Sequence, residues 1–139
     1  METLYTASAT TTGGRDGHVE SSDGVLNLEL TTPEEMGGEG GSGTNPEQLF
    51  AAGYSACFES ALRLVADQQD KDVGDALIKA SVKLGTTESG DFALAVELIG
   101  TLPNLSREED EDLMDEAHQV CPYSNATRGN VDVKLTIED

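Results

Sequence analysis

The segment from Leu49 to Leu62 constrains the fold most, because Glu59 is its only charged residue. Asn45 and Pro46 precede it, an N-cap residue followed by a residue favoured at the first helical position, so the sequence predicts a helix from Pro46 to about Asp67. A helix with almost no polar face is expected to be buried on nearly all sides. One small domain rarely covers a helix so completely, which indicates a partner chain packed on its stripe of small residues: Ala52, Gly53, Ala56 and Ser60.

The segments around this helix predict strands and one further helix. Alternating apolar residues and turn signals predict strands within residues 3–12, 25–30, 77–84, 92–99 and 131–137. The first of these strands form an antiparallel meander, and residues 86–91 link a hairpin. Ser106 and Glu109 have the spacing of a capping box, so a second helix starts there and the acidic run 108–112 is a solvated face of its first turn. We expect a single α+β domain over residues 1–139.

The charge of the chain excludes several classes of partner. There are 27 acidic and 8 basic residues, a formal net charge of −19. No basic patch can be assembled for nucleic acid, and anionic lipid is repelled. Self-repulsion of this size is screened only at high ionic strength, which indicates a salt-rich cytoplasm; the alternative is an acidic protein of a mesophile. No apolar run is long enough to span a membrane and the N-terminal residues are no signal peptide, so we expect no membrane partner and a cytoplasmic protein.

The two cysteines, Cys57 and Cys121, are the candidates for chemistry. A thiol must ionise to act as a nucleophile, but burial and the negative field both raise the pKa of Cys57. Cys57 lies more than two turns into its helix, so a nearby cation is needed. Of the four arginines, Arg15 lies between glycine turns, where a short polar residue would be ordinary. Arg15 is either a solvated turn residue or the cation that serves a thiolate.

Glu47 is the residue that could orient such an arginine by a bidentate contact. It is ten residues before Cys57, about 15 Å along a helix at 1.5 Å per residue. Two such helices packed antiparallel about a two-fold axis would bring Glu47 of one chain towards Cys57 of the other. The alternative role of Glu47 is in a capping box with Thr44, and both roles are compatible.

The two histidines, His18 and His118, leave two other chemistries open. Either could pair with a cysteine, or all four residues could bind zinc, but their spacings match no compact zinc motif. The glycine-rich segment 37–43 lacks the lysine of a phosphate-binding loop and is read as a flexible loop. We expect neither a metal nor a cofactor.

The chain resembles the organic hydroperoxide resistance proteins, the Ohr branch of the OsmC-like superfamily. The matching segments are Leu4–Ala7, Gly13–Gly17, Ser22–Leu26, Gly43–Phe58 and Cys121–Asn130, the last reading CPYSNATRGN. They extend over nearly the whole length, and the Tyr-Ser-Asn-Ala continuation after Pro122 favours the Ohr branch over the OsmC branch. Typical members are less acidic than this chain.

The resemblance implies an OsmC-like fold, with antiparallel sheets packed around a long central helix in an intertwined homodimer. It implies a thiol peroxidase that reduces alkyl or lipid hydroperoxides to alcohols, with Cys57 as the peroxidatic and Cys121 as the resolving cysteine. Arg15 then stabilises the thiolate and Glu47 holds Arg15. The implied reductant is a lipoylated protein or dihydrolipoamide.

Three rival interpretations remain at this point. The protein could bind apolar ligands or lipoyl groups with both cysteines in the core, it could belong to the OsmC branch with broader peroxide use, or Cys57 and Cys121 could form a structural disulfide. Retention of Arg15 and Glu47 argues against the first, because an apolar pocket needs neither.

Overall fold

The computed structural model describes residues 1–138 and divides into two compact units, Met1–Leu49 and the residues from Phe50 onward. In the first unit, three short strands form an antiparallel sheet in the order β1-β2-β3. Their bounds are β1 Ala9–Thr12, β2 His18–Ser21 and β3 Asn27–Glu29. Short 3-10 turns, η1 and η2, occupy Gly14–Asp16 and Glu34–Met36.

The predicted meander is therefore confirmed, but its strands are shorter than the sequence pattern indicates. Residues 3–8 lie outside β1, and residues 25 and 26 precede β3. Leu26 and Leu28 are exposed, and only Leu30 of that alternating set is buried. Because few side chains of this three-stranded sheet are buried, little apolar burial is available to stabilise longer strands.

Helix α1 spans Pro46–Gln68, as predicted, beginning in the first unit and continuing through the second. The Asn45 side chain caps it by accepting a hydrogen bond from the backbone N–H of Gln48. The Thr44–Glu47 capping box is not formed, because the Thr44 hydroxyl donates to the Gln48 side chain and the Glu47 carboxylate accepts from Arg15.

Burial of α1 is one-sided in the single chain. Its buried residues are Tyr54, Phe58, Ala61, Leu62, Val65 and Ala66. Ala52, Ala56 and Ser60 are exposed, so the expectation of burial on nearly all sides is wrong for one chain by itself. A second chain on this small-residue stripe stays a prediction.

The second unit contains a three-stranded sheet in the order β4-β5-β6. Strands β4 (Leu77–Thr86) and β5 (Phe92–Thr101) form the predicted hairpin, and β6 covers Asp132–Ile137. Strand β6 pairs parallel with β5, so this sheet is mixed rather than antiparallel throughout. The helices between β5 and β6 form a crossover, which returns the chain in the same direction. The predicted α+β class is confirmed.

Helix α2 (Arg107–Val120) starts at the predicted capping box of Ser106 and Glu109. The expectation of a fully solvated first turn is wrong for Asp110, which is 4% exposed. A short helix, α3 (Pro122–Thr127), follows directly and was not predicted. Because a residue before proline avoids the helical conformation, Cys121 is extended (φ −64°, ψ 124°) and separates the two helices.

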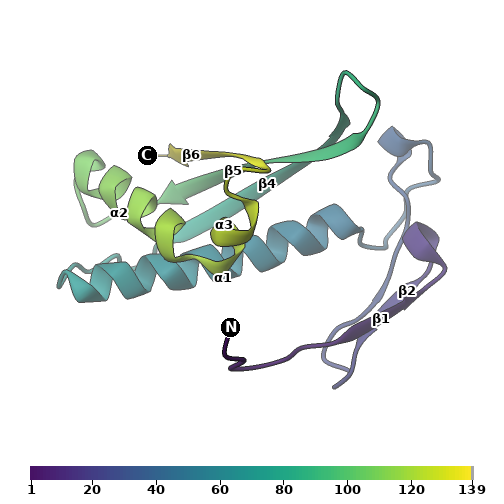
Figure 1. Cartoon of the computed structure of the whole chain (residues 1–139), viewed down its shortest axis with the longest axis horizontal. Coiled ribbons are helices and arrows are strands. Elements are labelled where there is room, and N and C mark those ends of the chain that lie inside the picture. Colours follow the sequence, from purple (N-terminus) through teal and green to yellow (C-terminus); the bar gives the residue numbers. More distant parts are fainter. Residues whose placement is uncertain (139) are drawn as a thin grey trace. The chain divides into compact units, whose positions relative to one another are not determined.

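One core joins the helices to the sheet in the second unit. Figure 1 shows α1 running beneath the strands of this sheet. Side chains from α1, β5 and α2 meet in a single cluster, which includes Phe58, Leu62, Leu98, Leu113 and Cys121. Among residues 1–138, no helix has the length and hydropathy that a membrane crossing requires.

Candidate active site

Arg15 is held by a tight turn between β1 and β2. Gly13 adopts a left-handed conformation (φ 75°), and a Cβ at Gly17 would lie 1.7 Å from the Thr12 carbonyl oxygen, so the turn needs glycine at both positions. Asp16 fixes the turn further by accepting hydrogen bonds from the backbone and hydroxyl of Thr32. The flanking glycines found in the sequence thus fix the place of the arginine.

Arg15 forms a bidentate ion pair with Glu47 in the first turn of α1. Arg15 Nη1 donates to Glu47 Oε1 at 2.7 Å, and Nη2 donates to Oε2 at 3.1 Å. The hydrogen bond to Glu47 raises the pKa of Arg15 above its ordinary value, against the opposing effect of partial burial. The structure therefore contains the Arg15–Glu47 contact that the sequence predicted, with Arg15 as a paired cation rather than a free turn residue.

Cys57 and Cys121 form the second pair of candidate residues. Cys57 lies on α1 and is partly buried, whereas Cys121 lies at the α2–α3 junction and is fully buried. Both thiols are free, and the side chain of Cys121 interacts directly with that of Cys57. Residues 64 positions apart are thus adjacent, the placement that disulfide formation requires.

The surroundings of Cys57 act on its ionisation in opposite directions. Burial is the largest effect and raises the pKa of Cys57 above its ordinary value. The backbone of Tyr123 lowers the pKa, because its N–H stabilises the thiolate, and the neighbouring Cys121 raises it again. Tyr123 was not singled out from the sequence, because a backbone donor leaves no residue-specific signal.

Tyr123 packs against α1 at Gly53. A Cβ at Gly53 would lie 2.7 Å from the Tyr123 hydroxyl oxygen, so the glycine makes room for the ring. Phe50 and Tyr54 complete an aromatic cluster, with their ring centroids 6.3 and 5.6 Å from that of Tyr123. The small-residue stripe predicted for a partner chain thus has a role within this chain at Gly53.

A buried polar cluster lies behind this aromatic group. The Tyr54 hydroxyl contacts the hydroxyls of Ser124 and Thr127, and Ser124 Oγ lies 2.8 Å from His118 Nδ1. Neither Ser124 nor Thr127 was a sequence candidate, since small hydroxyl residues are common in helices. His118 contacts Ser124, and His18 Nδ1 lies 2.8 Å from Glu29 Oε1 on the β2–β3 pair.

Metal ligation has no geometric support in the part of the chain that is described. Residues 1–138 contain no group of three or more His, Cys, Asp or Glu side chains arranged to hold an ion.

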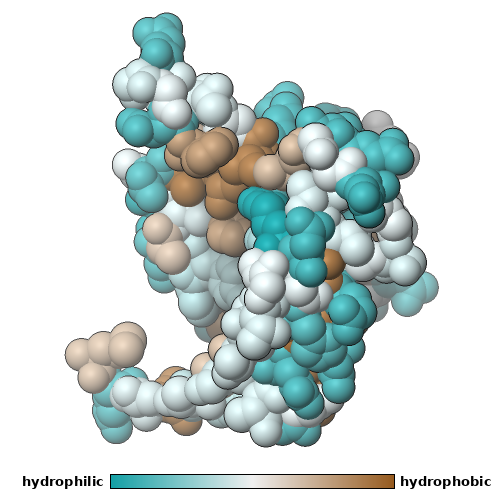
Figure 2. All heavy atoms as spheres, turned by 90° about the vertical axis from the view of Figure 1, so that its right-hand side faces the viewer, coloured by the Kyte–Doolittle hydropathy of each residue, from teal (hydrophilic) through white to brown (hydrophobic). Residues whose placement is uncertain are grey.

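An apolar groove of about 530 Å³ begins at Tyr123. It is lined by Phe50, Leu94, Pro122, Tyr123, Ala126, Thr127, Asn130 and Val131. Figure 2 shows hydrophobic side chains gathered beneath the tip of the β4–β5 hairpin, which projects at the top of that view. The groove could hold an alkyl chain beside the element that contacts Cys57.

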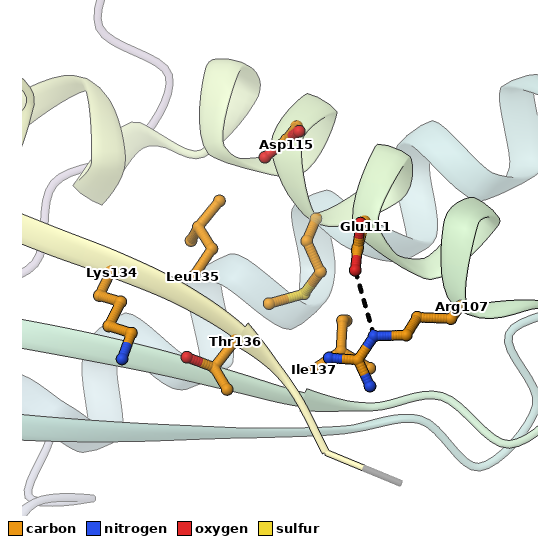
Figure 3. A pocket seen from close by; sticks show the side chains of 8 residues that line it. Arg107, Glu111, Asp115, Lys134, Leu135, Thr136 and Ile137 are labelled. Atoms are coloured by element: carbon orange, nitrogen blue, oxygen red, sulfur yellow. Dashed lines mark hydrogen bonds and ion pairs between the residues drawn. The ribbon is translucent and has the colours of Figure 1, made fainter.

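Another pocket of about 380 Å³ lies between α2 and β6 and contains no cysteine. Figure 3 shows that its charged side chains include Lys134 and an Arg107–Glu111 ion pair of 3.2 Å. None of the candidate site residues Arg15, Glu47, Cys57 and Cys121 lines this pocket.

Comparison with known proteins decides the family. The family model for OsmC-like proteins matches residues 38–136. The organic hydroperoxide resistance protein of Xanthomonas axonopodis pv. citri is 56% identical over 135 residues, covering 96% of this chain and 94% of the relative. This chain belongs to the organic hydroperoxide resistance (Ohr) branch of the OsmC-like family. The predicted resemblance is confirmed.

Solved structures of Ohr proteins have the same fold. The protein from Legionella pneumophila has a TM-score of 0.93 and 52% identity, covering 99% of this chain and 100% of the other. OhrB of Bacillus subtilis has a TM-score of 0.89 and 47% identity, covering 98% of this chain and 100% of the other. Membership of this branch is consistent with protection against organic peroxide stress.

Proposed function

We propose that this protein is a thiol peroxidase that reduces alkyl or lipid hydroperoxides to alcohols. The adjacency of the free thiols of Cys57 and Cys121 is the observation that carries the proposal. A partly buried thiol beside a fully buried one suits a peroxidatic and a resolving pair. The apolar groove at Tyr123 favours an organic hydroperoxide over hydrogen peroxide.

The reaction then follows from thiol chemistry. The Cys57 thiolate attacks the distal oxygen of the hydroperoxide, the O–O bond breaks, and the alkoxide takes a proton to leave as an alcohol. Cys57 is now a sulfenic acid. The thiolate of Cys121 attacks its sulfur, water leaves after protonation of the hydroxide, and a disulfide forms. A dithiol, for which we propose a lipoyl group on a protein or dihydrolipoamide, reduces the disulfide by exchange.

We further propose that the Arg15–Glu47 pair lowers the pKa of the Cys57 thiol in a homodimer. A partly buried thiolate in a chain of net charge −19 needs a nearby cation, and the pair supplies one that two hydrogen bonds hold in place. Glu47 and Cys57 are ten residues apart on α1, about 15 Å along a straight helix, so a two-fold partner is the natural source of the contact. Free thiols are ordinary in the cytoplasm, where we expect the protein to act.

Peroxide consumption with dihydrolipoamide as reductant tests this function. Wild type, Cys57→Ser and Cys121→Ser are compared in molar salt with cumene hydroperoxide and with hydrogen peroxide. We expect turnover of the organic hydroperoxide that Cys57→Ser abolishes, and a single turnover without disulfide in Cys121→Ser. Activity that survives Cys57→Ser would assign Cys57 to the core and favour a binding protein for apolar ligands.

A further inference from the structure

Four hydrogen bonds connect α1, α2 and α3 behind the cysteines. His118 Nδ1 lies 2.8 Å from Ser124 Oγ, and Ser124 Oγ lies 2.8 Å from the Tyr54 hydroxyl. The Tyr54 hydroxyl lies 3.1 Å from Thr127 Oγ1, which in turn donates to the Ser124 carbonyl oxygen at 3.2 Å. Tyr54 and Ser124 are completely buried and Thr127 is 5% exposed. Water therefore cannot readily replace a broken bond of this chain, and breaking one costs folding free energy.

The number of protons in this chain of bonds fixes the state of His118. Four hydrogen bonds need four protons, and the three hydroxyls supply one each. The Ser124 carbonyl only accepts, so the fourth proton must be on His118 Nδ1. The direction is then His118 to Ser124, Ser124 to Tyr54, Tyr54 to Thr127, and Thr127 to the carbonyl. Burial, followed by the positive charge of Arg128, lowers the pKa of His118, while Asp115 opposes this, so the neutral ring with Nε2 unprotonated is favoured.

This chain of hydrogen bonds links α2 and α3, the two helices that Cys121 separates. His118 lies three residues before Cys121 in α2, and Ser124 three residues after it in α3. Cys121 itself is extended, so backbone bonding of a continuous helix does not fix the angle between the two helices. Arg128 adds a second link, since Nη2 donates to the His118 carbonyl oxygen at 2.5 Å and to Asn125 Oδ1 at 2.9 Å.

We infer that His118, as the Nδ1–H tautomer bonded to Ser124, is a positioning residue that holds Cys121 and the Tyr123 N–H against Cys57. This inference rests on the proposed peroxidase cycle, in which Cys121 condenses with the Cys57 sulfenic acid. A disulfide forms only within narrow limits of distance and torsion, so a loosened α2–α3 junction slows the condensation. The sulfenic acid then persists, and a second hydroperoxide oxidises it to sulfinic acid.

Single-turnover oxidation of reduced protein by one equivalent of cumene hydroperoxide tests the inference. Dimedone trapping measures the Cys57 sulfenic acid, and mass spectrometry measures the disulfide. We expect His118→Leu and Ser124→Ala to slow disulfide formation by at least about tenfold, since small misplacements of reacting groups lower rates by this much. Sulfinic acid should then accumulate at excess hydroperoxide. Asn places a side-chain amide donor near the Nδ1 position, so His118→Asn should restore the rate to within about threefold of wild type.

Nitrogen-15 NMR of the imidazole provides a readout that does not depend on activity. We expect a protonated Nδ1 and an unprotonated Nε2 in the wild type at pH 7, and loss of the hydrogen-bonded Nδ1–H signal in Ser124→Ala. Circular dichroism checks folding, and if His118→Leu loses helix, Ser124→Ala carries the kinetic test because it removes one oxygen atom.

Three outcomes would overturn the inference. They are an Nε2–H tautomer in the wild type, a wild-type rate of disulfide formation in the two disruptive variants, or an equal defect in His118→Asn and His118→Leu, which would indicate packing alone. A wild type that forms no Cys57–Cys121 disulfide contradicts the proposed function itself, and the imidazole spectrum distinguishes that failure from an error in the hydrogen-bond assignment.

Discussion

The ring of Tyr123 occupies the space beside Gly53 in which a side chain of α1 would lie. A Cβ at position 53 would be 2.7 Å from the Tyr123 hydroxyl oxygen and 3.2 Å from Cε2 and Cζ of the ring. The backbone of the same tyrosine stabilises the Cys57 thiolate. A glycine four residues before Cys57 thus permits the approach of the segment that supplies a hydrogen-bond donor to the thiol.

Gly53→Ala is expected to lower the reactivity of Cys57 without lowering the stability of the fold. Alanine favours a helix over glycine by about 1 kcal/mol, which offsets the displacement of a ring that is partly exposed. The rate of Cys57 alkylation by iodoacetamide at fixed pH should fall, because the Tyr123 backbone moves away from the thiol. Tyrosine fluorescence follows the displacement of the Tyr123 ring, because the chain has no tryptophan to obscure this signal.

Tyr123→Phe provides the matched control for this substitution. It removes the atom nearest to the added Cβ, so Gly53→Ala should slow alkylation less in the Tyr123→Phe background than in the wild type. Equal alkylation rates for wild type and Gly53→Ala would show that the ring is displaced without moving its backbone, and the prediction would be wrong.

Cys121→Ala is expected to lower the pKa of Cys57. The Cys121 side chain raises that pKa, by hydrogen bonding and by its charge once ionised, so removing the sulfur favours the Cys57 thiolate. The pH profile of Cys57 alkylation should shift to lower pH in Cys121→Ala. A Cys57→Ala variant corrects for reaction at Cys121, and a profile unchanged or shifted upward would contradict the prediction.

Local signals in the sequence predicted the elements that local interactions specify. Asn45 and Pro46 marked the start of α1, and Ser106 with Glu109 marked that of α2, because caps depend on residues within one turn. The glycines around Arg15 indicated a turn, and a bidentate contact with Glu47 was one of the two roles that the sequence left open for this arginine.

The remaining parts depend on contacts between distant residues. Strand β6 pairs parallel with β5 because the helices between the two strands form a crossover. The alternation of apolar residues along a strand does not reveal this direction of pairing. Helix α3 has six residues, too few for a hydrophobic period to be visible. The partners of His118 and Gly53 come from other helices, so neither Ser124 nor Tyr123 was detectable as part of the site.

Arg15→Lys is expected to reduce peroxidase activity while leaving stability almost unchanged. Lysine keeps the charge but cannot form the two parallel hydrogen bonds to Glu47. The side chains of Arg15 and Glu47 are 33% and 18% exposed, so their pair contributes no more than about 1 kcal/mol to folding. We expect kcat/KM for cumene hydroperoxide to fall at least about tenfold, equivalent to 1.4 kcal/mol of transition-state stabilisation.

Arg63→Lys is the control for a general effect of replacing arginine. Arg63 pairs with Glu59 on the exposed side of α1, and its side chain is 47% exposed. Its replacement should leave kcat/KM unchanged. Equal activity of Arg15→Lys and wild type would show that charge alone is sufficient, and an equal loss in both variants would remove the special role of Arg15.

Thermal stability is expected to rise steeply with KCl. The formal charge of −19 makes the folded chain repel itself, and the Debye length falls from about 10 Å at 0.1 M to about 3 Å at 1 M. Since 1 kcal/mol changes the Tm of a domain of this size by about 4 °C, scanning calorimetry from 0.1 to 2 M KCl should resolve the effect.

Asp75→Asn with Glu88→Gln removes two exposed loop charges and should raise Tm at 0.1 M KCl. Screening predicts that this gain shrinks at 2 M; a gain of the same size at both concentrations would instead assign the salt effect to the exclusion of salt from apolar surface.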